Sequence, residues 1–238
     1  MRRIALIAAL PGELRYLVGG WESESREGVR LWRFAAGGDL EIIAACAGMG
    51  AAAAARAFAA ARRDGPLGLV VSAGWAGSLR PELKAGRVCR LAGVIDARTG
   101  ERFPTDGGGP DGWAVTAAAA AGREEKWRLA AAFGATVVEM EAAEIARQAR
   151  AAGVPFRCLK AVSDGWNEDL PDFGKFMDAD GGLRWGGFAA EVLARPWRWP
   201  RLMRLGRNSG RAARNLTREL PDFMMKRLEE RTDGPAGA

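Results

Sequence analysis

Residues 136–164 read TVVEMEAAEIARQARAAGVPFRCLKAVSD, and this stretch decides the fold. Thr136–Glu139 is short and rich in β-branched residues, which predicts a strand. Ala142–Ala152 favours a helix, and the apolar run Phe156–Val162 predicts a second buried strand that ends at Ser163-Asp164. A strand, a helix and a strand in this order are typical of a βαβ unit with parallel strands.

The same alternation continues toward the N-terminus, while the glycine-rich stretch Thr99–Gly112 predicts a surface loop. We therefore predict a three-layer αβα fold with a central mixed, mostly parallel sheet. Asp164 is expected at the carboxyl end of a strand, where open α/β sheets bind their ligands. Further strands are predicted at Arg3–Leu10, Val29–Phe34, Leu40–Cys46, Leu67–Ser72 and Arg87–Ile95, and further helices at Ala51–Arg63 and Glu124–Phe133.

The composition narrows the chemistry, because the chain of 238 residues contains no histidine. Catalysis by Ser-His-Asp or Cys-His groups is thereby excluded, and so are the common zinc and non-haem iron sites. The three cysteines lack CxxC spacing and are odd in number, which favours a reducing, cytoplasmic compartment over a disulfide framework. Acid–base chemistry near neutral pH is expected from carboxylates whose pKa is raised.

The basic charge is concentrated at the C-terminal end. The chain carries 35 Lys/Arg and 29 Asp/Glu, and residues 195–238 alone hold 11 of the basic and 5 of the acidic residues. We therefore divide the chain into a catalytic domain at 1–194 and a basic amphipathic extension at 195–238. At helical spacing one stripe of the extension is apolar and the opposite side is arginine-rich. The stripe consists of Leu202, Leu205, Ser209, Ala212, Ala213, Leu216 and Leu220, and the basic side of Arg201, Arg204, Arg207, Arg211, Arg214 and Arg218.

Two interpretations of this extension stay open. Residues 195–220 can form an interfacial helix on an anionic membrane surface, with tryptophans at its start, peripheral to the inner face of the membrane. Alternatively, the helix packs on the domain and leaves its arginines in water. Binding to nucleic acid is not expected, because few aromatic residues are interleaved with the arginines.

Four acidic residues are candidates for the chemistry, namely Glu13, Glu139, Glu141 and Asp164. Taken singly, each of them is also compatible with an ordinary turn or helix-start position. Together, five blocks in one order resemble the nucleoside phosphorylase superfamily, with the methylthioadenosine/S-adenosylhomocysteine nucleosidase branch as the best match. The most specific block is Val138–Ala146. The other blocks are Ile4–Leu14, Ala47–Gly50 with the alanine-rich helix after it, Ser72–Gly86, and Val154–Asp164.

The resemblance assigns roles to residues of these blocks. It implies that Asp164 is the acid that protonates or hydrogen-bonds N7 of the purine, and that Glu13 activates water. Glu141 is expected to accept hydrogen bonds from the ribose hydroxyls, and Met140 to pack on the sugar. The further substrate-binding residues are expected to be Glu139, Gly77, Ser163 and Trp75.

The resemblance implies no metal and no cofactor, and it leaves the nucleophile open. Related phosphorylases hold phosphate with an arginine and a serine of the central glycine segment, where this chain has Ser72 and Trp75. This difference favours water, although phosphate stays open as a co-substrate. The aromatic residue that stacks on adenine in the nucleosidases is missing from Thr116–Ala121. Trp113, Trp127 or Trp166 is expected to bind the base instead.

The catalytic blocks and the basic extension together resemble the hopanoid-associated phosphorylase branch, especially at Arg195–Pro200. This resemblance implies release of adenine from adenosylhopane, a lipid-linked nucleoside. Because relatives with this fold are usually dimers or larger, we also expect a homo-oligomer. Two alternatives remain. One is a methylthioadenosine/S-adenosylhomocysteine or futalosine nucleosidase, and the other is a membrane-associated nucleoside-binding module without catalysis.

Overall fold

The structure, a computed structural model, describes residues 2–170 and 199–232, and the side chains of the last helix up to Met225. Its strands form one mixed sheet in the order β2-β3-β4-β1-β5-β10-β9-β7-β8, and β11 pairs with both β5 and β6. The predicted domain boundary at 194/195 lies outside the described residues. The strands are β1 (Arg2–Ala8), β2 (Glu22–Arg26), β3 (Val29–Ala35), β4 (Leu40–Cys46), β5 (Leu69–Ser78), β6 (Val88–Arg90), β7 (Gly93–Asp96), β8 (Arg102–Pro104), β9 (Trp113–Thr116), β10 (Val137–Glu139) and β11 (Phe156–Asp164).

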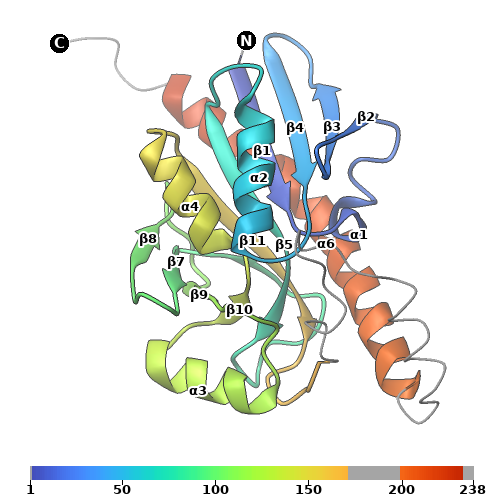
Figure 1. Cartoon of the computed structure of the whole chain (residues 1–238), viewed down its shortest axis with the longest axis vertical. Coiled ribbons are helices and arrows are strands. Elements are labelled where there is room, and N and C mark those ends of the chain that lie inside the picture. Colours follow the sequence, from blue (N-terminus) through green and yellow to red (C-terminus); the bar gives the residue numbers. More distant parts are fainter. Residues whose placement is uncertain (1, 171–198, 233–238) are drawn as a thin grey trace.

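Helices cover both faces of this sheet, as Figure 1 shows. The alanine-rich α2 and the amphipathic α4 pack on each other and on one face, where they share a core with β1, β5 and β11. The last helix, α6, covers the other face next to α1. The predicted three-layer αβα fold with a mixed sheet is therefore confirmed. The helices are α1 (Pro11–Leu14), α2 (Ala51–Arg62), α3 (Arg123–Phe133), α4 (Ala142–Ala151) and α6 (Trp199–Thr232).

Three predicted elements differ in the structure, which also contains α1, β2 and β9 where the sequence analysis predicted no element. The strand predicted at Leu67–Ser72 continues through the glycine segment to Ser78 as β5. The strand predicted at Arg87–Ile95 is two strands, because the chain leaves its partner β11 after β6 and pairs with β9 from β7 onward. The predicted loop Thr99–Gly112 contains the short strand β8, which forms a hairpin with β7.

The long central strand β5 brings the candidate site together. Its first half pairs in parallel with β1, and its end pairs antiparallel with β10 at Gly77 and Ser78. Along its other edge it pairs in parallel with β11, as far as Asp164 opposite Gly77. The chain segments that follow β1, β10 and β11 therefore meet around the last residues of β5, which places three sets of acidic residues in one region.

Helix α6 has the predicted amphipathic pattern, and the structure shows what its apolar side faces. Ala212, Leu216 and Leu220 are fully buried and pack on residues of β1, β5 and β11. Asn215 Nδ2 donates a hydrogen bond of 2.7 Å to the carbonyl of Gly86, which ties the helix to the domain. This half of the helix follows the packed-helix interpretation. Its apolar side belongs to the protein core and is not free to enter a membrane.

The first half of α6 is more open. Met203 is 57% exposed and Trp199 is 43% exposed. All six arginines of the predicted basic side are exposed, at Arg201, Arg204, Arg207, Arg211, Arg214 and Arg218. No helix in the described ranges is long and apolar enough to cross a membrane.

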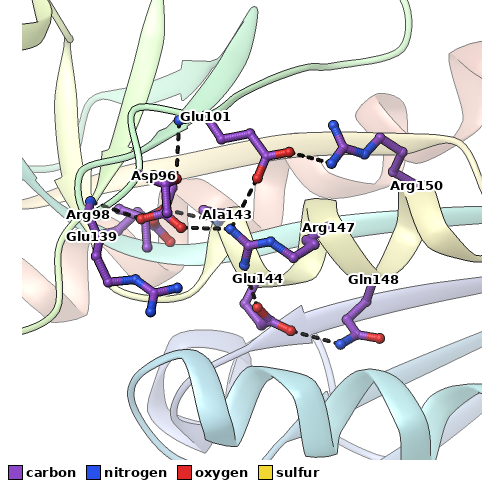
Figure 2. Close-up of polar contacts among 11 residues, drawn as sticks. Asp96, Arg98, Glu101, Glu139, Ala143, Glu144, Arg147, Gln148 and Arg150 are labelled. Atoms are coloured by element: carbon purple, nitrogen blue, oxygen red, sulfur yellow. Dashed lines mark hydrogen bonds and ion pairs between the residues drawn. The ribbon is translucent and has the colours of Figure 1, made fainter.

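An ion-pair network fixes the outer side of α4 to the β7–β8 hairpin (Figure 2). Arg147 reaches Asp96 at 2.7 Å, Glu144 at 2.6 Å and Glu101 at 3.4 Å. Arg150 also pairs with Glu101. Because α4 begins directly after Glu141, this network ties to the hairpin the helix whose first turn follows Glu141.

Candidate active site

A cavity of about 240 Å³ lies beside the last residues of β5, and it gathers the residues that the sequence selected. Small-molecule pockets usually measure about 300–1,000 Å³, so this cavity is slightly smaller than that range. All eight predicted site residues line it: Glu13, Trp75, Gly77, Glu139, Met140, Glu141, Ser163 and Asp164. The remaining lining is mostly apolar and includes Met49, Ala119–Ala121, Leu170 and, from α6, Leu205 and Ser209.

Glu13 lies on the short helix α1, just after β1, and is 4% exposed. Its carboxylate accepts two backbone hydrogen bonds, from Leu10 N at 2.9 Å and from Trp75 N at 2.8 Å. Burial raises the pKa of Glu13, and these backbone amides and the nearby Lys160 oppose the rise. The side chain is thus a rigidly held carboxyl group with increased basicity, which suits a general base.

Glu139 is held by protein groups at the end of β10. Its Oε2 accepts the amides of Glu141 and Ala142 at 3.1 and 2.8 Å, which satisfies free N–H groups at the start of α4. The buried ammonium of Lys160 lies 2.9 Å from the same oxygen, and Thr116 donates to the other one. Glu139 lines the cavity, but its geometry makes it an anchor for the neighbouring Glu141.

Glu141 is a buried carboxyl group at the start of α4 that also accepts backbone hydrogen bonds. Its oxygens accept the amides of Gly50 at 2.8 Å and of Met140 at 3.2 Å. Burial and then repulsion from Glu139 raise the pKa of Glu141 to about 7, while the positive charge of Lys160 acts in the opposite direction. Glu141 therefore changes its charge near neutral pH.

Asp164 closes β11 and is 2% exposed. Ser163 Oγ donates to its Oδ1 at 2.6 Å, and Lys126 Nζ donates to its Oδ2. Lys126 comes from α3, which is separate in the chain from every predicted site residue. Lys126 and Asp164 thus form a buried ion pair at the cavity, which needs the remaining donors of Lys126 to be satisfied as well.

Two glycines of β5 leave room for these acids. Gly74 has φ +144°, and a Cβ there would lie 2.8 Å from Glu13 Oε1. A Cβ at Gly77 would lie 2.9 Å from Asp164 Oδ2 and 3.0 Å from Lys126 Cε. The sequence suggested that Gly77 lets the backbone approach a nucleoside. The structure adds that both glycines make space for the protein's own carboxylates.

The expected aromatic residues for the base are not at the cavity. Trp127 and Trp166 pack on each other with ring centroids 5.7 Å apart, and Trp113 packs over Gly93. None of these three is among the residues that line the cavity, so that expectation is wrong. Trp75 does line it, and its buried Nε1 has no hydrogen-bond partner in the part of the chain that the structure describes.

Sequence reasoning missed the two buried lysines of the site. Lys160 interrupts the apolar strand Phe156–Val162, and a charge in a fully buried strand needs a partner, so this signal was present. Lys126 gave no such signal, because it lies in the charged sequence Arg123–Arg128, where a solvated lysine is the ordinary case.

The model of a known protein family matches residues 3–121 and 113–182, which together span most of the chain, and its description is the phosphorylase superfamily. The chain belongs to the phosphorylase superfamily. A search of curated proteins found no match to this superfamily member.

Solved structures share the fold of this superfamily member. S-adenosylhomocysteine nucleosidase of Streptococcus pyogenes, in complex with 5-methylthiotubericidin, has a TM-score of 0.70 at 19% identity and covers 94% of this chain and 96% of its own. A mutant of the Helicobacter pylori nucleosidase with 5′-methylthioadenosine in its active site has a TM-score of 0.71 at 17% identity, covering 95% and 99%. Futalosine hydrolase of Helicobacter pylori has a TM-score of 0.69 at 17% identity, covering 94% and 98%.

Proposed function

We propose that the chain is an enzyme that cleaves the N-glycosidic bond of a 5′-modified adenine nucleoside. The observation that carries this proposal is the meeting of Glu13, Glu141 and Asp164 around one cavity in a chain of the phosphorylase superfamily. The solved nucleosidases with this fold bind methylthioadenosine and its analogues. The shared cavity is an observation of geometry, and the likeness to these nucleosidases is a likeness of fold.

The chemistry assigned to these groups resembles glycoside hydrolysis, in which bond breaking produces a ribosyl cation-like transition state. As the bond between C1′ and the purine breaks, its electron pair moves into the base, and Asp164 delivers a proton to N7. Glu13 accepts a proton from the water whose oxygen bonds to C1′. Glu141 in its ionised form accepts hydrogen bonds from the ribose hydroxyls.

We favour water as the nucleophile. Lys126 is the only basic side chain among the described residues that line the cavity, and its ammonium group is engaged with Asp164. A phosphate dianion beside several carboxylates would lack a compensating cation, which is costly in a site removed from water. Phosphorolysis would require an arginine from outside this set.

We further propose adenosylhopane as the substrate. The cavity has an apolar lining that includes Leu205 of α6, so a hydrophobic 5′ substituent could contact this helix. The exposed Trp199, Met203 and arginines of the same half of the helix suit the surface of an anionic membrane, where a lipid-linked nucleoside would be located.

The experiment compares products by mass spectrometry after incubation of the full chain with adenosylhopane, 5′-methylthioadenosine, S-adenosylhomocysteine or futalosine, each with and without phosphate. We expect adenine and a free ribosyl product from adenosylhopane. A ribosyl 1-phosphate would show phosphorolysis, and preference for a small 5′ group would favour the nucleosidase alternative.

Asp164→Asn and Glu13→Gln should each lower the rate of base release by about 10²–10⁴-fold, the usual contribution of a general acid or base. Glu125→Gln is the matched control, since Glu125 pairs with Arg128 outside the cavity. Binding of the nucleoside without release of any base by the unmodified chain would indicate a binding module.

A further inference from the structure

Lys126 is a fully buried cation whose donors all have partners. Its side chain is 0% exposed and donates to Asp164 Oδ2, to the carbonyl of Gly165 at 2.8 Å and to the carbonyl of Glu168 at 2.9 Å. An ammonium group has three N–H donors, so this geometry satisfies it completely. Such a set of partners is expected for the charged form of lysine, because each of the three acceptors receives a proton.

Asp164 is correspondingly arranged as a carboxylate. Its Oδ2 accepts from Lys126 and its Oδ1 accepts from Ser163, so both oxygens act as acceptors. The function proposed above nevertheless requires Asp164 to deliver a proton to the purine. Within the described residues, Lys126 is the neighbouring group that holds a transferable proton against this carboxylate.

We propose that Lys126 is the proton source of the reaction and acts through Asp164, an inference that rests on the proposed function. An N–H bond of Lys126 Nζ breaks and an O–H bond forms at Asp164 Oδ2. This O–H bond then breaks as N7 of the departing purine takes the proton. Lys126 is left as a neutral amine and Asp164 as a carboxylate, and solvent reprotonates Lys126 when the base leaves.

Two properties of the site favour this transfer. Lys126 and Asp164 are both removed from water, and an ion pair loses much of its advantage over the neutral pair of amine and carboxylic acid when hydration is lost. The side chain is also a lysine. Lysine can give up its proton, whereas the guanidinium of arginine stays protonated in proteins.

The test compares Lys126→Arg and Lys126→Met across a range of pH, with kcat for adenine release from the nucleoside that the unmodified chain cleaves best. Lys126→Arg keeps a cation beside Asp164 but has no transferable proton, so we expect kcat to fall by at least about 10²-fold at every pH. In Lys126→Met the proton must be held by Asp164 alone. We expect its kcat to rise as the pH falls, with the alkaline limb at lower pH than in the unmodified chain.

Arg128→Met on the same helix is the control, because Arg128 is exposed and pairs with Glu125. Its pH profile should match that of the unmodified chain. Thermal unfolding identifies any variant that does not fold, and Lys126→Met, which has nearly the volume of lysine, then carries the comparison alone. An alkaline limb of Lys126→Met at the original pH would overturn the inference, and so would activity of Lys126→Arg within threefold of the unmodified chain. Absence of base release by the unmodified chain would instead reject the proposed function, and the inference with it.

Discussion

Glu141 links the acidity of the site to the stability of the fold. Its pKa rises from 4.5 to about 7, mainly through burial. The folded chain therefore binds a proton more tightly at this residue than the unfolded chain does. Between these two values the free energy of unfolding decreases as the pH rises, because Glu141 is ionised in the unfolded chain and must take up a proton on folding, and this proton uptake becomes less favourable as the proton concentration falls.

We expect the contribution of Glu141 to stability to decrease by about 3 kcal/mol between pH 4.5 and pH 7. Urea unfolding at several pH values, for the unmodified chain and for Glu141→Gln, measures this contribution as the difference between their pH slopes. Glu13 also has a raised pKa, but it is present in both proteins. Equal slopes for the two proteins would contradict the assignment.

At the scale of elements, the end of β5 accommodates the carboxyl groups of Glu13 and Asp164 because it has glycines where side chains would clash with them. Gly74→Ala would place a Cβ 2.8 Å from Glu13 Oε1 at a backbone φ of +144°, so Glu13 must move. We expect the rate of base release to fall by about 10²-fold or more, as expected when a general base is displaced. The measurement is kcat, together with thermal unfolding to confirm that the variant is folded.

Gly134→Ala is the matched control for this glycine. Gly134 also has a positive φ, +62°, at the end of α3, but a Cβ there would have no neighbour within 4 Å. It should cost about 1–2 kcal/mol of stability and leave kcat unchanged. If both variants lost activity equally, general strain would explain the effect and the specific contact with Glu13 would not.

The sequence was sufficient for much of this arrangement, because each acid follows an apolar strand whose end could be located. The bounds of β4 were predicted to the residue, and the predicted convergence of Glu13, Glu141 and Asp164 is confirmed. The position of Lys126 could not be predicted. It depends on how α3 lies against the end of β11, and no local pattern in Arg123–Phe133 indicates that tertiary contact.

At the scale of the whole molecule, α6 takes part in the core and in the cavity wall. Ala212, Leu216 and Leu220 complete the core, while Leu205 and Ser209 line the cavity. The same helix carries the exposed arginines, so a surface that attracts them would bring the cavity close to it. We assign the proposed membrane contact to the first half of α6, because Trp199 and Met203 are exposed there beside the arginines.

We expect the chain to bind vesicles that contain anionic lipid, and to bind them less as salt rises, since charge attraction is screened within about 10 Å at 0.1 M. Replacing Arg201, Arg204 and Arg207 with glutamine should weaken binding by about 100-fold, at about 1 kcal/mol for each arginine. Vesicle sedimentation measures both effects.

The control replaces three exposed arginines of other elements, Arg26, Arg62 and Arg98, with glutamine. It removes the same charge from the chain, so the two triple variants separate local attraction from net charge. Equal weakening of vesicle binding by both triple variants would remove the support for a surface specific to α6. Vesicle binding that does not depend on salt concentration would exclude the arginines as the anchor.

The cavity is enclosed by two independent parts of the fold, the strand ends and α6, so its substrate selectivity can change without a change in its reacting groups. The carboxylates come from strand ends that are fixed by the sheet register, whereas Leu205 and Ser209 come from a helix remote from them in the chain. Exchanging a bulky for a small side chain at position 205 would resize the wall and leave the reacting groups in register. A single ancestral reaction can in this way be retained while the range of accepted molecules drifts.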